Sequence, residues 1–383
     1  MKKILIFAFI IIVFSSLFSG FVYADEKQDF LDNTYDIIDE LDTENLDELF
    51  CENDYFNSIH GNNVKEKLKS LLTSEIDNEN LLETLVKGIL FDFSKFLPFL
   101  ISLFIIAVFS GMFESIKPDG QASAMAGAVY LVCYLCSIIL LISQFVIIVD
   151  ETVDMVEKIA KQMQVVMPLI LSLMAVSGMT SSVAIYRPIV LILSNSVTKF
   201  ILSVLIPLVT GITIINLLSQ LTDKLRLNKF KELLSSAFRW IIGLTLTIFS
   251  FFLTIKGVTA STTDGVSLSA IKYMTSQVPI VGGFLREGTD IFLASALLIK
   301  NAVGKMAVFI FFWEMLTPVL SLIVLMFGLN IVSALAEPFA DYKLVNAYSG
   351  MAKSIGYLLS ILLMVLFMFV LTILLLICSS SIL

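Results

Sequence analysis

The sequence predicts an all-α membrane protein, a polytopic helix bundle. Of its 383 residues, 57% are hydrophobic and 15% are charged, whereas soluble domains carry about 25% charged residues. Several apolar runs approach the ~20 residues that a helix needs to cross a bilayer. The last third of the chain also matches the part before it, so we expect a parallel internal repeat that contains broken or re-entrant helices. A signal peptide and an acidic, helical, exported segment are expected to precede this membrane region.

Residues 1–24 have the three parts of a secretory signal peptide. A basic start at Lys2 and Lys3 precedes an apolar stretch, and small residues end at Ala24, where a signal peptidase would cleave. A retained first membrane helix is the alternative. Both interpretations place the residues from Asp25 onward outside the cytoplasm.

Residues 25–92 contain 19 acidic and 5 basic residues, with apolar residues at helical spacing between them. This pattern fits either a solvated acidic arm or an acidic docking surface for another exported protein. Residues 93–383 contain 14 acidic and 18 basic residues. Neither part has the basic stripe typical of nucleic-acid binding, so we expect no nucleic acid as a partner.

A transmembrane hairpin is predicted over residues 93–149. Its two spans run from about Phe93 to Phe113 and from about Ala126 to Val149, and a polar turn joins them. Because the chain before the hairpin lies outside, the turn is expected in the cytoplasm and the hairpin returns outside at Asp150.

The predicted repeat pairs residues 150–256 with residues 261–378. Matched prolines, asparagines and charged residues carry this assignment, because apolar runs match one another easily: Pro168 with Pro279, Pro207 with Pro318, Asn216 with Asn330, and Ser219 with Ser333. Each copy begins with an amphipathic helix and a proline. An apolar pair of segments, a long span, a charged loop and a final span follow.

Polar residues are expected to break the apolar pair at Ser177–Pro188 in the first copy and at Gly282–Asp290 in the second. The short segments Ile189–Ser194 and Ile291–Ile299 then form re-entrant half-helices, or they fuse with the span that follows. Basic residues in the loop 222–239 place it in the cytoplasm by the positive-inside rule. The two copies are then parallel, and the C-terminus lies outside.

No motif of an enzyme, a cofactor site or a metal site occurs in the sequence. The phosphate-binding loop, the zinc-protease helix and the serine nucleophile elbow are all absent, and His60 is the only histidine. Cys133 and Cys136 lie in an apolar run, where helix packing is the expected role. We therefore expect a protein that is not an enzyme and holds no cofactor or metal.

Polar residues within apolar runs are the candidates for function. Ionisable groups at membrane depth are costly and face a bundle interior or a cavity. The candidates for a conduit or gate are Glu314, Lys300, Lys305, Gly282, Gly283, Pro279 and Pro168. A pair of Glu314 with Lys305 or Lys300 is one interpretation, and snorkelling lysines with a structural ion pair are the other. Interhelical hydrogen bonds are the expected role of Asn216, Asn330, Ser219 and Ser333.

The stretch GVSLSAIKYMTSQVPIVGGF at 265–284, followed by LLIKNAVG at 297–304, resembles the stage III sporulation protein AE family of endospore formers. The signal peptide and the acidic segment fit the same family. The resemblance implies a multipass protein of the mother-cell-derived outer forespore membrane. It further implies, as partners, the other stage III A sporulation proteins, including a secretion-type ATPase and a ring-forming protein, together with a forespore-side partner and membrane lipid.

Three functions remain open at this point. The first is a non-enzymatic subunit of a channel or secretion complex that links mother cell and forespore. The second is a secondary transporter or permease of a small solute, built on the duplicated broken helices. The third is a scaffold whose acidic segment recruits partners.

The topology predicts how single cysteines will react in a cysteine-free background in intact sporulating cells. Cysteines at Lys229 and Tyr342 are expected to be shielded from an impermeant reagent, because both positions lie in the cytoplasm. A cysteine at Thr263 is expected to react from outside. Labelling at Lys229 from outside would contradict the parallel arrangement.

Overall fold

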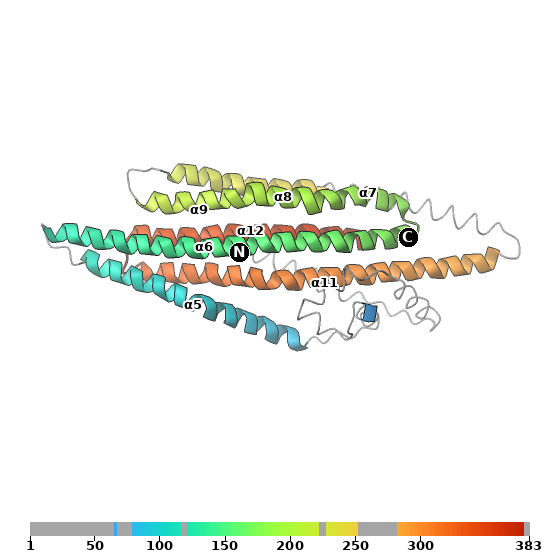
Figure 1. Cartoon of the computed structure of the whole chain (residues 1–383), viewed down its shortest axis with the longest axis horizontal. Coiled ribbons are helices and arrows are strands. Elements are labelled where there is room, and N and C mark those ends of the chain that lie inside the picture. The colour runs from blue at the N-terminus through green and yellow to red at the C-terminus, as the bar shows by residue number, and fades with distance from the viewer. Residues whose placement is uncertain (1–64, 67–78, 116–120, 222–226, 252–281, 379–383) are drawn as a thin grey trace.

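The computed structural model describes residues 65–66, 79–115, 121–221, 227–251 and 282–378, which are helical almost throughout and contain no strand (Figure 1). The signal peptide, most of the acidic segment and residues 252–281, which include Pro279, lie outside the described residues. The helices are α5 (Glu79–Ser115), α6 (Gln121–Val176), α7 (Thr180–Leu191), η2 (Ile192–Val197), α8 (Thr198–Phe200), η3 (Ile201–Leu205), α9 (Ile206–Leu221), an unlabelled helix at Asn228–Phe251, α11 (Gly282–Ala336) and α12 (Tyr342–Cys378).

Helix α12 is the centre of the bundle. It packs along α11 and also contacts α6 and α9, and its residues from Leu344 to Leu376 supply a large share of the buried apolar side chains. Helix α5 lies against α6 and α11 on one side, and the run from α7 to α9 lies on another (Figure 1). Six helices are long and apolar enough to cross a membrane within the described part of the chain. The predicted all-α membrane bundle is thus confirmed at this level.

Three pairs of helix ends meet at the left end of the bundle in Figure 1. There α5 turns into α6, α9 turns into Asn228–Phe251, and α11 turns into α12. The run from α7 to α9 and helix α11 therefore point the same way, as a parallel repeat requires. The repeat itself stays a prediction.

Helix α6 joins two elements that the sequence analysis separates. The predicted span Ala126–Val149 and the predicted amphipathic helix Asp150–Gln164 form one continuous helix of 56 residues. The acidic and basic residues after Val149 are good helix formers, so the change from apolar to charged residues marks a change of surroundings and not a helix end. Pro168 also lies inside α6, with its ring on the exposed surface.

The predicted breaks are shorter or absent. In the first copy the chain leaves the helix only at Ser177–Met179, where Gly178 takes a positive φ of 79° that glycine adopts without strain. Helical structure then continues from Thr180 to Leu221, with two π-helical segments at η2 and η3. Pro188 is helical.

In the second copy Gly282–Asp290 opens α11 as helix, so the break predicted there is wrong. The short segments Ile189–Ser194 and Ile291–Ile299 are parts of longer helices and not separate half-helices. A helical glycine costs only about 1 kcal/mol relative to alanine, which packing along a 55-residue helix outweighs.

Glycines permit close approaches within the bundle. A Cβ placed on Gly111 of α5 would lie 1.4 Å from the backbone oxygen of Phe339, and one on Gly350 of α12 would lie 2.0 Å from Nδ2 of Asn216. Lipid tails are as apolar as leucine, so helices in a bilayer associate through such close packing.

The Gly111 contact predicts a large effect of a single methyl group. Gly111→Ala is expected to destabilise the purified protein by about 1–3 kcal/mol or more, because the added carbon would overlap a backbone atom. Gly243→Ala is the matched control, since a Cβ there meets nothing within 4 Å. Thermal unfolding in detergent measures both variants, and equal melting temperatures would contradict the packing.

Candidate functional site

Glu314 lies at the centre of a polar cluster between α6 and α11. Its Oε1 lies 2.5 Å from Nζ of Lys158, and its Oε2 accepts a hydrogen bond from the amide of Gln162. The Glu314 side chain is 8% exposed and that of Lys158 is 53% exposed. The pair therefore reaches from the bundle interior to its surface. The partner of Glu314 is Lys158, not Lys300 or Lys305 as the sequence analysis considered.

Lys300 is buried on α11 and serves a different contact. Its Nζ donates hydrogen bonds to the backbone oxygens of Leu376 at 2.8 Å and Ile377 at 3.3 Å. These carbonyls belong to the last turn of α12, where four carbonyls lack a partner within the helix. A cation there also interacts favourably with the helix dipole. Lys300 thus fastens the end of α12 to α11.

Among the other conduit candidates, those that the structure describes do not join the Glu314 cluster. Lys305 is half-buried on α11, and Pro168 is exposed on α6. Gly282 and Gly283 are the first two residues of α11, and Pro279 lies outside the described residues. The structure therefore brings Glu314 together with two residues that sequence reasoning missed, Lys158 and Gln162. The sequence did offer a signal for them, because a charged lysine and an amide side chain follow directly on a predicted membrane span.

Asn216 lies where three helices meet. It is buried on α9, its Oδ1 accepts a hydrogen bond of 2.6 Å from Nζ of Lys231, and its side chain packs on Gly350 of α12. Lys231 belongs to the helix Asn228–Phe251. Asn216 therefore contacts both neighbouring helices at the end where α9 turns.

Asn330, the predicted counterpart of Asn216, lies in a different environment. It is exposed, and its amide donates to the carbonyl of Met326 in its own helix at 2.8 Å. Ser333 donates across to the carbonyl of Val345 in α12 at 3.1 Å, while Ser219 donates to the carbonyl of Asn216 in its own helix. Interhelical bonds therefore occur at Asn216 and Ser333, while Asn330 and Ser219 each donate to a carbonyl of their own helix.

A buried hydroxyl network is a second feature that the sequence analysis missed. The hydroxyl of Tyr134 on α6 donates to the carbonyl of Leu217 on α9 at 3.0 Å. Tyr348 on α12 donates to the carbonyl of Leu103 on α5 at 3.1 Å. Its oxygen lies 3.0 Å from Oγ of Ser137, so Ser137 is the donor in that pair. A tyrosine in an apolar run is the signal, because a buried hydroxyl requires a partner.

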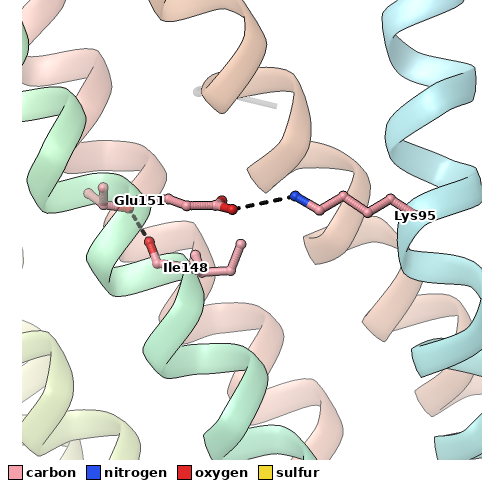
Figure 2. A network of polar contacts seen from close by, with 4 residues as sticks. Lys95, Ile148 and Glu151 are labelled. Atoms are coloured by element: carbon pink, nitrogen blue, oxygen red, sulfur yellow. Dashed lines mark hydrogen bonds and ion pairs between the residues drawn. The ribbon is translucent and has the colours of Figure 1, made fainter.

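An ion pair on the surface links α5 to α6. Figure 2 shows Lys95 of α5 reaching toward Glu151 of α6, with 3.4 Å between Nζ and Oε1. Both side chains are about half exposed, so the pair contributes little to stability. The pair does show that the first charged residues of α6 lie beside Lys95 of α5.

These contacts are all within the chain, and none forms a recognisable catalytic group. Within the described ranges no cluster of three or more histidine, cysteine, aspartate or glutamate side chains could hold a metal. What the arrangement offers is a set of charged and polar links between long apolar helices.

A family model described as stage III sporulation protein AE matches residues 62–380. The chain belongs to this family. The stage III sporulation protein AE of Bacillus subtilis (strain 168) is 25% identical over 281 residues, which cover 73% of this chain and 70% of that protein. No solved structure matches the chain.

Family membership, together with the six apolar helices, makes this chain a multipass membrane protein of sporulation. The match includes all described helices and the stretch at 265–304 on which the resemblance depended. The recognition of the family from the sequence is confirmed.

The Glu314 cluster predicts an asymmetric response to mutation. Lys158→Met is expected to cost about 1–3 kcal/mol of folding free energy, because it leaves a nearly buried carboxylate without its cation. Glu314→Gln is expected to cost less, since Lys158 remains half exposed and hydrated. The double variant is expected to recover part of the loss.

Thermal unfolding of the purified variants tests this order. Lys161→Met is the matched control, because Lys161 lies one turn further along α6 and is exposed. A loss in the control equal to that of Lys158→Met would show that the ion pair is not the cause.

Proposed function

We propose that this chain is a non-enzymatic integral membrane subunit of a transenvelope channel or secretion complex that links mother cell and forespore. It would lie in the outer forespore membrane. Its partners would be the other stage III A sporulation proteins, including a secretion-type ATPase and a ring-forming protein, and a forespore-side channel partner. Membership of the stage III sporulation protein AE family carries this proposal.

The geometry favours a packed subunit over a solute carrier. A carrier requires polar groups near the midplane that a solute can reach and that alternate between two states. Here the two carboxylate oxygens of Glu314 bond Lys158 and Gln162, and Lys300 bonds the end of α12. These polar groups hold helices together, which supports a component that works through its partners.

A permease remains the second candidate because of one observation. The ion pair of Lys158 and Glu314 extends from the surface into the interior between two long helices, and ionisable groups in such places mark ion or solute paths in many carriers. A permease would transport without any partner, whereas the proposed subunit would not.

Affinity purification of the tagged full-length chain from sporulating cells tests the proposal. The expected result is that the other stage III A proteins co-purify in a constant ratio, while an unrelated tagged multipass protein from the same cells brings down none of them. Recovery of the chain without any of these proteins, in a detergent that preserves their contacts with one another, would overturn the proposal.

The purified chain in liposomes separates the two candidates. The subunit is expected to leave proton and potassium fluxes at the level of protein-free liposomes. Flux that depends on the chain and is lost in Glu314→Gln would favour the permease. Flux that persists in that variant would indicate a leak away from this site.

A further inference from the structure

The two longest helices are far longer than a bilayer is thick. Helix α6 has 56 residues and α11 has 55, which at 1.5 Å per residue gives lengths of roughly 80 Å. The hydrocarbon layer is about 30 Å thick. Both helices run as straight, neighbouring rods in Figure 1, so only a part of each can lie in lipid.

The surface of α6 changes character at Asp150. Between Gly127 and Val149 seven large apolar side chains are exposed, namely Leu131, Val132, Leu135, Ile139, Ile142, Val146 and Ile147. From Asp150 to Val176 only Val176 is a large apolar residue on the surface, and the other exposed residues are charged, polar, small or proline. The exposed surface of α6 is therefore suited to lipid before Asp150 and to water after it.

The charges after Val149 are numerous enough to decide where lipid ends. Six ionisable residues of α6 are exposed within a stretch of twelve: Asp150, Glu151, Asp154, Glu157, Lys158 and Lys161. Each charged residue at the centre of a bilayer costs about 2.5–3.5 kcal/mol on insertion scales. The six together would cost on the order of 15 kcal/mol or more, so this stretch cannot lie in hydrocarbon.

Three other helices reach a charged residue after a length close to that of the apolar surface of α6, which spans an interval of 22 residues from Gly127 to Val149. Beyond Glu114 in the last turn of α5, the interval from the end where the hairpins turn is 20 residues from Ser115 to Lys95, 22 from Leu221 to Lys199 and 22 from Ala336 to Glu314. Each interval is about 30–33 Å long, which matches one hydrocarbon layer. The helix Asn228–Phe251 has 24 residues and exposes large apolar side chains from Phe230 to Phe251, together with the charged Arg239 at its middle.

We propose that lipid covers only the part of the bundle between the end where the hairpins turn and these charged residues. The remainder of α6 and α11, the whole of α7 and the last third of α12 project out of the membrane into water. On α6 the projecting part runs from Asp150 to Val176, which is roughly 40 Å. Its apolar residues are the core of a water-facing bundle: Met163, Met167, Ile170 and Met174 are fully buried. The segments 165–176 and 295–313 are therefore apolar without crossing the membrane.

The projecting half lies on the extracytoplasmic side. Lys229, Lys231 and Lys343 lie in the first turn of their helices at the end where the hairpins turn, and basic residues near span ends mark the cytoplasmic side. The inference rests on lengths, charges and exposure, and it does not depend on the proposed function.

Two exposed serines on α6 provide a matched test in the full-length chain. Ser143 lies in the part assigned to lipid and Ser172 in the projecting part. In a cysteine-free background, Ser143→Cys and Ser172→Cys carry a nitroxide label, and the purified proteins are placed in liposomes. Collision with oxygen, which concentrates in lipid, is compared with collision with a water-soluble nickel chelate. Only variants with the helical content and elution volume of the parent are used.

The label at Ser143 is expected to favour oxygen severalfold over the nickel chelate, and the label at Ser172 is expected to favour the nickel chelate. If both labels favour oxygen, the second half of α6 lies in lipid and the proposal is wrong. If both favour the nickel chelate, the apolar surface is not the lipid contact and the proposal is equally wrong.

The side of the membrane is tested in non-sporulating cells that express the full chain in their cytoplasmic membrane. An impermeant maleimide is expected to label Ser172→Cys in intact cells at least about tenfold faster than Ser143→Cys, because thiolate forms in water and not in hydrocarbon. Labelling of Ser172→Cys only after permeabilisation would place the projecting half in the cytoplasm and overturn the assignment of the side.

Discussion

Helices inside a bilayer gain nothing by exchanging leucine–lipid contacts for leucine–leucine contacts, so close packing and hydrogen bonds must hold them together. This constraint explains the central place of α12. In the part assigned to lipid, its glycine at Gly350 admits Asn216 of α9 and its Tyr348 bonds the backbone of α5. In the projecting part, its last turn accepts Lys300 of α11. The contacts to α9 and α5 lie two residues apart in the first half of α12, the contact to α11 lies in its last turn, and the bundle assembles around this helix.

The polar groups follow from the same constraint. An unsatisfied donor or acceptor away from water is costly, so a buried hydroxyl or charge is favoured where another helix or its own backbone offers a partner. Tyr134 and Tyr348 bond backbone carbonyls of α9 and α5. Glu314 bonds two side chains of α6. These groups therefore specify which helices are neighbours, in addition to stabilising them.

Irregular backbone is concentrated in the run from α7 to α9. The two π-helical segments there, η2 and η3, precede Pro207, which lacks the amide hydrogen that a regular helix would use. Helix α11 contains the matching Pro318 without a change of helix type. The two copies of the predicted repeat thus differ in helix type at this position, although both carry a proline there.

The sequence by itself determined the helical membrane class and the family, because hydrophobic content, span length and the stretch at 265–304 are properties of the chain alone. It also marked Glu314 and Asn216 as polar residues in apolar surroundings. It did not identify Lys158, Gln162 or Tyr348 as partners, since these contacts join positions more than 100 residues apart.

Only the tertiary structure decided where helices continue. The sequence suggests an end at Asp150 and a break at Gly282–Asp290, yet Asp150 lies inside α6 and Gly282–Asp290 forms the first residues of α11, because the local preferences for a turn are weak. The sequence also did not determine which apolar residues are exposed and which are buried. An apolar residue such as Met167 has the same hydropathy whether it faces lipid or a protein core, and only the neighbouring helices determine which it contacts.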